Sequence, residues 1–334
     1  MASNGFVHTP VTSSSALPLG LPVLAQDPNS KTPYSVQWHA TIEQQIPYST
    51  VLKFAYVGTK GEHLDGLRDI NAGSPGTTNV TVNRPYPFFA QINLLETNEI
   101  SNYNALQVTA ERRARGLNFL ASYTYSHALD ESTGSPGSIA NPYNIRANYG
   151  NSDLNIPNRF VASASYELPF KSLGKLNYVV EGWQLNTILN YFDGLPFSVS
   201  SSSGVGDGIT PRAQLLPGFG NGSLPSGQRT LQHWFNTGAF TNPVTGTWGN
   251  SGRNILQGPG TKTVDFSFFK NTHVTESKAL QLRAEFFNLF NTPQFDNPGA
   301  TAGTGAIGTI SSAGSESTFQ RIGRQVQLAA KITF

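Results

Sequence analysis

The chain has 334 residues, of which 13% are charged and 11% are aromatic, and it contains no cysteine. The charged share is about half of the roughly 25% usual in soluble globular domains, while a mean hydropathy of −0.27 excludes a chain that is apolar throughout. The formal net charge of +2 indicates no nucleic-acid partner, and the lack of cysteine excludes disulfides and thiolate metal sites.

Segments in which apolar and polar residues alternate with a period of two predict nine strands. Such alternation places one face of a strand in an apolar medium and the other in a polar medium. In chain order the segments are residues 34–43, 52–56, 106–111, 117–126, 160–168, 183–191, 264–268, 280–286 and 325–334. A further short strand is expected around residues 92–95. We expect antiparallel strands of about 9–12 residues that cross a membrane at a tilt and pair as a meander.

The last segment alternates strictly and stops on an aromatic residue. Its apolar positions are Val326, Leu328, Ala330, Ile332 and Phe334. Outer-membrane barrels commonly end on such a closing strand with a terminal Phe. The pattern therefore predicts that Phe334, in phase with Ile332 and Ala330, acts as a signal for barrel assembly.

The predicted connections alternate in length. Short links follow the first, third, fifth and seventh strands, whereas long segments rich in Gly, Ser, Asn and Pro follow the others; the longest is residues 198–262. Short periplasmic turns and long extracellular loops are typical of outer-membrane barrels. The pattern predicts an extracellular loop segment at residues 1–33, a barrel portion at residues 34–334 and a periplasmic carboxy-terminus.

Charged residues test which face of each strand meets lipid. A charged side chain at the middle of the lipid face costs roughly 2–4 kcal/mol. The charged residues on the polar face, which we expect to face the lumen, are Glu43, Lys53, Glu111, Glu167, Asp265, Arg283, Glu285 and Lys331. Arg283 and Glu285 are expected to join ion pairs with neighbouring strands rather than to bind a ligand. A soluble β-sandwich would also keep charges off its buried face, so this alternative stays open.

The number of strands predicts an incomplete barrel. Nine is odd, whereas bacterial single-chain barrels have even numbers of strands. An unpaired sheet edge in lipid leaves N–H and C=O groups unsatisfied at several kcal/mol each. The sequence also shows no export signal. We therefore expect an all-β, antiparallel transmembrane barrel that is partial, with its first strands and its true amino-terminus missing.

Several segments resemble the Oar-like class of TonB-dependent receptors. They include residues 27–34 (DPNSKTPY), 56–64 (YVGTKGEHL), 119–126 (FLASYTYS), 250–260 (NSGRNILQGPG) and 280–291 (LQLRAEFFNLFN). The resemblance implies a 22-strand outer-membrane barrel with a plug in its lumen, driven by TonB, behind an amino-terminal regulatory-like domain. The TonB box, plug and amino-terminal domain are absent from this sequence. The implied partners are outer-membrane lipid, the barrel-assembly machinery, TonB only through the missing plug, and a small ligand that the sequence does not identify.

The sequence contains no motif for covalent chemistry. Residues 303–308 (GTGAIG) match a dinucleotide-binding pattern, but they lie in a loop without the strand–turn–helix context that this motif needs. The six His are not at metal-ligand spacing. We therefore expect no catalytic residue, no metal site and no cofactor.

Three functions remain in order of preference. The first is the carboxy-terminal barrel portion of a receptor that binds and imports a nutrient in the intact parent. The second is a surface protein for adhesion or interaction, anchored by the barrel and without transport. The third is a soluble β-rich enzyme, placed last because catalytic motifs are missing.

Overall fold

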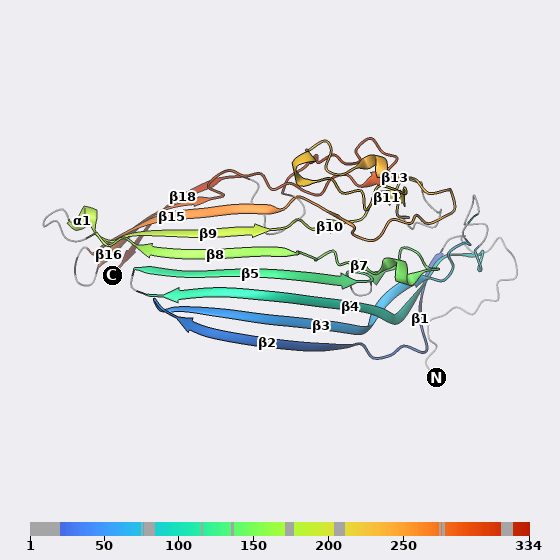
Figure 1. The fold of residues 1–334 in the computed structure, drawn as a ribbon, viewed down its shortest axis with the longest axis horizontal. Coiled ribbons are helices and arrows are strands. Elements are labelled where there is room, and N and C mark those ends of the chain that lie inside the picture. The colour runs from blue at the N-terminus through green and yellow to red at the C-terminus, as the bar shows by residue number, and fades with distance from the viewer. Residues whose placement is uncertain are drawn as a thin grey trace.

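The computed structural model describes residues 21–74, 76, 84–114, 116–134, 137–170, 177–203, 211–273, 275, 278–314 and 323–334. The first 20 residues of the predicted loop segment 1–33 lie outside this described part. The described residues form one large β-sheet and a set of loops gathered at one end of it (Figure 1).

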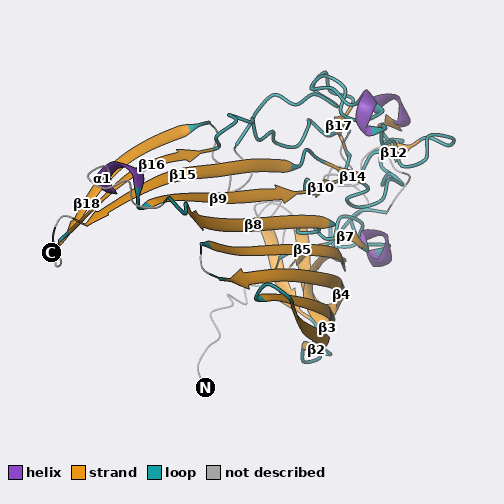
Figure 2. Cartoon of the chain, turned by 60° about the vertical axis from the view of Figure 1, so that its left-hand side comes forward, coloured by secondary structure: helices purple, strands orange, loops and turns teal. Residues whose placement is uncertain are grey.

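Nine strands pair in sequence order and form what we call the sheet wall, so the predicted antiparallel meander is confirmed. Their bounds are β2 (Tyr34–Ile46), β3 (Thr50–Asp69), β4 (Phe89–Arg113), β5 (Leu117–Asp130), β8 (Asn158–Glu167), β9 (Trp183–Phe192), β15 (Thr261–His273), β16 (Ala279–Phe287) and β18 (Gln325–Thr333). The carboxy-terminus and the short turns lie at one end of the wall, and the long loops lie at the other (Figures 1 and 2).

The remaining elements are short. The strands are β1 (Leu21–Gln26), β6 (Gly137–Ser138), β7 (Gly150–Asn151), β10 (Pro196–Phe197), β11 (Ser200–Ser201), β12 (Gln214–Leu215), β13 (Phe240–Thr241), β14 (Leu256–Gln257) and β17 (Thr301–Ala302). The helices are α1 (Asn177–Val180) and the 3-10 turns η1 (Ile145–Asn148), η3 (Ser226–Gln228) and η4 (Thr237–Ala239).

Five strands exceed the expected length of about 9–12 residues: β2 and β15 have 13 residues and β5 has 14, and two strands are much longer. β3 has 20 residues and β4 has 25, and the short strand expected around residues 92–95 is part of β4. The two strands pair from Thr50↔Arg112 to Asp69↔Asn93, with register shifts near Leu64. About 9–11 tilted residues suffice to cross a bilayer, so the pairs from Thr50↔Arg112 to Lys60↔Asn102 can span it. The remaining parts of β3 and β4, on the side of the long loops, are an outer extension.

A strand that the alternation did not predict lies beside this extension. β1 pairs in parallel with β4, with Leu24 opposite Asn93 and Gln26 opposite Leu95. Asp27 continues the contact, since its backbone N–H donates to the Leu95 carbonyl at 2.9 Å. The segment before β2 is thus held at the loop end of the wall.

The two edges of the wall do not meet. Among the described strands, β2 and β18 each have one wall neighbour, and no ladder joins them. Twelve of the 13 residues of β2 are exposed, so neither face of this strand is covered. The open edge expected for the first strand is therefore confirmed, and the barrel is partial.

The long loops fold into a body with its own core. This loop cluster comprises the described parts of residues 193–260, between β9 and β15, and residues 288–314, after β16. The buried core residues are Phe197, Val199, Ala213, Phe235, Ala239, Phe240, Leu256 and Ala302. Phe235 packs against Phe197 and Phe240 with ring centroids 5.7 and 5.6 Å apart. The pairs β10–β14, β11–β17 and β12–β13 support this core.

Candidate functional site

The strand register places the eight charged candidates on one face of the sheet wall. Residues directly opposite each other on neighbouring strands share a face, and so do residues two apart on one strand. Glu43 lies opposite Lys53, and Glu285 lies opposite both Ser267 and Gln327. The full set on this face is Glu43, Lys53, Glu111, Glu167, Asp265, Arg283, Glu285 and Lys331. We call it the polar face.

A continuous polar row crosses seven strands of this face near the short turns. It consists of Arg113, Asn118, Ser165, Asn186, Ser267, Glu285 and Gln327. Gln184 donates to Ser165 at 2.7 Å and to Asn186 at 2.8 Å, and Asn186 donates to Ser267 at 3.3 Å. Amides and hydroxyls both donate and accept, so the row can hydrogen-bond water, a polar solute or a peptide backbone.

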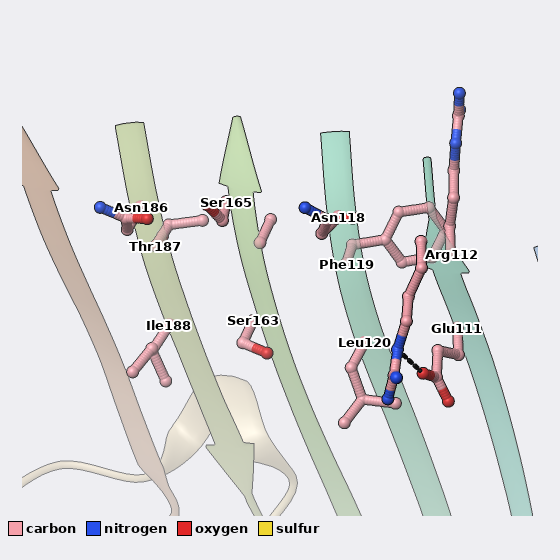
Figure 3. Close-up of a pocket in the computed structure, with 12 residues that line it drawn as sticks. Glu111, Arg112, Asn118, Phe119, Leu120, Ser163, Ser165, Asn186, Thr187 and Ile188 are labelled. Atoms are coloured by element: carbon pink, nitrogen blue, oxygen red, sulfur yellow. Dashed lines mark ion pairs between the residues drawn. The ribbon is translucent and has the colours of Figure 1, made fainter. Parts of the chain in front are cut away.

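A shallow hollow of about 380 Å³ opens on the polar face at this row (Figure 3). Side chains from four adjacent strands, β4, β5, β8 and β9, line it. Its charged lining residues are Glu111, Arg112 and Arg113. Glu111 and Arg113 form an ion pair at 2.5 Å, in which the Arg113 side chain is 83% exposed. Such an exposed pair contributes little to stability. The hollow combines these polar groups with apolar side chains such as Leu120 and Ile188.

Arg283 does not form the ion pairs expected of it within the described part of the chain. Its Nε donates to Gln281 Oε1 at 2.6 Å, and its guanidinium lies 4.8 Å from the centroid of the Phe269 ring. Phe269 lies opposite Arg283 and therefore on the polar face. An aromatic neighbour at this position stacks the guanidinium, whereas the prediction assumed a carboxylate partner.

The other face of the wall is apolar and exposed. Its large exposed side chains include Val36, Trp38, Phe54, Tyr56, Leu106, Tyr123, Tyr125, Phe268, Leu282, Leu328 and Ile332. Ala330 and Ile332 lie opposite Leu282 and Leu280 on this face. Phe334 follows β18 and is 92% exposed. A continuous exposed apolar surface of this kind is a site of contact with lipid or with another protein.

Arg253 joins the loop cluster to the outer end of β5. Its guanidinium donates to the Asp130 carboxylate, to Thr133 Oγ1 at 2.9 Å and to Asp153 Oδ1 at 3.2 Å. The Arg253 side chain is 10% exposed and that of Asp130 is 12% exposed. Asn254 adds bonds to the carbonyl of Asn151 at 2.7 Å and to Asp153. Arg253 and Asp130 are 123 residues apart, so no local signal in the sequence could identify the pair.

Glu99 is a buried carboxyl in the outer extension of β4. It is 3% exposed, accepts a hydrogen bond from Ser132, and has Oε1 without a partner in the described part of the chain. Burial, together with Glu131 and Asp130, raises the pKa of Glu99 to about 7, although Ser132 and Arg253 act in the opposite direction. Burial also raises the pKa of Glu131. Neither residue lies in the membrane-crossing parts of the strands, and neither was among the predicted candidates because the alternation breaks here.

The described residues offer no evident metal centre. No group of three or more acidic or His side chains in this part of the chain is arranged to hold an ion. Across the same residues, no helix has both the length and the apolar character needed to traverse a membrane.

The family described as an outer membrane beta barrel domain matches residues 1–327 of the chain. No curated protein matches the chain. Among solved structures, the chain is similar to the outer membrane transporter YddB from Escherichia coli, with a TM-score of 0.49 and 10% identity over 94% of this chain and 34% of that one.

Two further solved structures are similar to a lower degree. The FrpB iron transporter from Neisseria meningitidis has a TM-score of 0.45 and 12% identity, over 93% of this chain and 33% of that one. The ferric-catecholate import receptor Fiu from E. coli has a TM-score of 0.43 and 10% identity, over 91% and 28% of the two chains. The chain thus spans about a third of the length of the first two structures.

Proposed function

The chain belongs to the outer membrane beta barrel domain family, and on that basis we propose that it is the carboxy-terminal barrel portion of a TonB-dependent receptor. The family places it in the outer membrane. In the intact parent, the barrel and its outer loops bind a nutrient, and a plug driven by TonB releases it inward. The chain itself contributes the wall, the polar face and the loop cluster, and performs no covalent chemistry.

The observation that carries the proposal is the open meander of nine strands with an apolar exposed face. Unpaired edges in lipid cost several kcal/mol for each unsatisfied backbone group. The edges of β2 and β18 therefore need further strands of the same barrel. A barrel with about 22 strands is wide enough to enclose a plug, whereas a closed nine-strand barrel is not.

The proposal also assigns the parts of the wall. Residues 1–33 belong to an extracellular loop segment, and residues 34–334 to the partial barrel. The polar face lines the lumen, with Glu43, Lys53, Glu111, Glu167, Asp265, Arg283, Glu285 and Lys331 facing it. The apolar face contacts outer-membrane lipid. The barrel-assembly machinery recognises the last strand through Ala330, Ile332 and Phe334. In support, Ala330 and Ile332 share one face, and among the described strands β18 has only β16 as a neighbour, which leaves its other edge accessible.

The test compares transport with adhesion in the organism that makes the intact parent. We expect deletion of the parent gene to abolish growth on one or more nutrients at low concentration, and loss of TonB to abolish the same growth. A mutant without the plug should retain the barrel in the membrane but not the growth. Surface attachment that requires the parent and survives loss of TonB, with no growth defect, would instead support the adhesion function and contradict transport.

A further inference from the structure

A second cavity, of about 240 Å³, lies where the loop cluster meets the outer ends of the strands. Four separate segments form its wall: residues 151–157 before β8, Pro196 in β10, residues 221–229, and residues 254–257, which include β14. The cavity holds roughly eight waters at about 30 Å³ each. It is therefore the size of one small ligand, such as a single sugar unit, and too small for a folded partner.

The framework of the cavity is held by side chains whose hydrogen bonds are already used. Asn254 is 4% exposed and has a positive φ of 53°. Its Oδ1 accepts from Ser198 at 3.0 Å, and its Nδ2 donates to Asn151 O and to Asp153. Asn151 donates back to the Asn254 carbonyl at 2.9 Å and bonds His127 at 3.0 Å. These two residues hold the wall and do not offer free groups to a ligand.

Three other polar side chains keep free groups on the cavity wall. Asn155 uses its Oδ1 to accept from Ala128 N at 2.8 Å, and Gln257 uses its Nε2 to donate to Gly194 O at 3.3 Å. Within the described part of the chain, Asn155 Nδ2, Gln257 Oε1 and Ser223 Oγ have no protein partner. One amide donor, one amide acceptor and one hydroxyl suit a ligand with several hydroxyl groups.

Arg229 gives the cavity its charge. It is the one charged side chain among the described residues that line the cavity, so none of these residues is a carboxylate. Its Nε donates to Leu224 O at 2.8 Å, and its guanidinium lies 5.6 Å from the Trp234 ring centroid. Trp234 is fixed in turn by a bond from Nε1 to Gln257 O at 2.8 Å. The two Nη groups have no described partner, so a positioned guanidinium fork is free to pair with an oxyanion.

We propose that this cavity binds a sugar-sized, hydroxylated ligand that carries one carboxylate or phosphate group. Arg229 pairs with the oxyanion, while Asn155, Gln257 and Ser223 hydrogen-bond the hydroxyls. Pro157, Pro196 and Leu256 supply the apolar part of the wall, as small-molecule sites commonly combine apolar walls with a few placed polar groups. The proposal deepens the function given above and rests on it for the role of the cavity in capture.

The test measures binding to outer membranes that carry the intact parent, using radiolabelled glucuronate, glucose 6-phosphate and glucose in equilibrium dialysis. We expect saturable binding of at least one of the two acids, at least about tenfold tighter than the binding of glucose. Only the acids carry an oxyanion that can pair with Arg229. Preference for glucuronate identifies a carboxylate ligand, and preference for glucose 6-phosphate a phosphate ligand. Equal binding of glucose, or no saturable binding by a chain with an intact loop cluster, overturns the proposal.

Variants separate this role from a structural one. Arg229→Gln should weaken acid binding about tenfold without changing glucose binding. Arg229→Lys should weaken acid binding less, because lysine keeps the positive charge. Arg146→Gln is the matched control, since this exposed arginine in η1 lies outside the cavity wall. Limited proteolysis of the loop cluster must be the same in all variants.

Acid binding that Arg229→Gln leaves unchanged overturns the proposal. TonB-dependent growth of the parent without acid binding contradicts only this inference, and acid binding without such growth contradicts only the transport function.

Discussion

On β18 in the sheet wall, Leu328 is 77% and Ile332 66% exposed, whereas in the loop cluster Phe235 is 2% exposed. The wall is stabilised by its ladder of backbone hydrogen bonds and, on the proposed function, by lipid that covers its apolar surface. The loop cluster is stabilised like a small water-soluble domain, by a buried aromatic core and by side chains that bond loop backbone groups. The two regions therefore depend on different surroundings for their stability, and the same kind of substitution should have a different effect on stability in the wall and in the loop cluster.

The side-chain hydrogen bonds follow the same division. In the membrane-crossing part of the wall, polar side chains bond across strands, as Asn186 does to Ser267. In the loop cluster they replace missing ladders, as when Asn250 Oδ1 accepts from Leu215 N at 2.6 Å and Trp234 donates to Gln257 O. Removal of one such partner takes away a net contribution of about 0.5–1.5 kcal/mol for each hydrogen bond. Irregular loops in this cluster are therefore fixed by individual side chains.

The largest effect should come from breaking the link between the two regions. Arg253→Ala leaves the Asp130 carboxylate, 12% exposed, without its charged partner. Breaking a buried ion pair costs about 3–5 kcal/mol. We expect the loop cluster to lose protection in hydrogen exchange and to be cleaved faster by protease, while the ladder from β8 to β18 stays protected.

The control for this prediction is Arg113→Ala, which removes an ion pair whose Arg113 side chain is 83% exposed. Hydrogen exchange should be unchanged in both regions. Equal loss of protection in wall and loops by Arg253→Ala would show that the two regions unfold as one unit and would contradict the comparison.

A charge on the apolar face should have the next largest effect. Leu106 is 45% exposed in the membrane-crossing part of β4, opposite Tyr56 and Tyr125. Leu106→Arg should cost roughly 2–4 kcal/mol if this position meets the bilayer middle. We expect a lower inserted fraction of the intact parent, measured by heat-modifiable gel mobility of outer membranes. Gln107→Arg, one residue along and on the polar face, is the control and should insert normally; the reverse result would exchange the two faces.

The alternation predicted the wall because it depends on local sequence alone. Val326, Leu328 and Ile332 repeat every second residue, and the register confirms that they share a face. The same alternation assigned Glu43 and Lys53 to one face, and the two residues lie directly opposite each other on β2 and β3. The outer extension was missed because Gly58, Gly61 and Gly66 interrupt the pattern in β3, and β-structure there depends on partners distant in sequence.

The loop cluster could not be predicted from the sequence. Phe197, Phe235 and Phe240 come together without any periodic spacing, within a segment whose Gly, Ser and Asn content indicated only a loop. The cavity at Arg229 likewise needs four segments between residues 151 and 257 to be placed. Side-chain bonds across such distances are set by tertiary contacts and have no local signal.

A change of pH should loosen the boundary between the regions. The folded pKa of Glu99, about 7, lies above the ordinary value of 4.5 for this side chain. Folding therefore favours the protonated carboxyl. The contribution of Glu99 to the free energy of unfolding is fully present below about pH 4.5, and it is lost as the pH rises through about 7. The shift corresponds to at most about 3 kcal/mol. We expect lower protection factors for residues 96–101 at pH 8 than at pH 5.5, where each factor is the intrinsic exchange rate divided by the observed rate at the same pH.

The groups that face Glu99 are Ser132, Glu131, Asp130 and Arg253. Glu99→Gln removes the titrating group and keeps its shape, so the pH dependence of the protection factors should largely disappear. Gly66 lies against the Glu99 carboxyl, and a Cβ there would collide with it, so the site cannot relax by moving toward β3. A pH dependence that persists in Glu99→Gln would assign the effect to Glu131, whose pKa burial also raises.

The smallest effect on stability, with a large effect on delivery, should come from deletion of Phe334. This side chain is 92% exposed and directly follows Thr333, the last residue of β18. The alternation in the sequence predicts that it lies in phase with Ile332 and Ala330. Its removal takes away at most about 1.5–3 kcal/mol of apolar burial, which a large inserted barrel can absorb. If the assembly machinery recognises the last strand, the inserted fraction of the parent should fall far more than the melting temperature of the molecules that do insert.

Heat-modifiable mobility measures the inserted fraction, and thermal scans of purified outer membranes measure the melting temperature. Replacement by Tyr should restore insertion, because an aromatic ring remains. Normal insertion after the deletion, or a melting loss large enough to explain the lower amount, would show that Phe334 contributes only its burial to the wall.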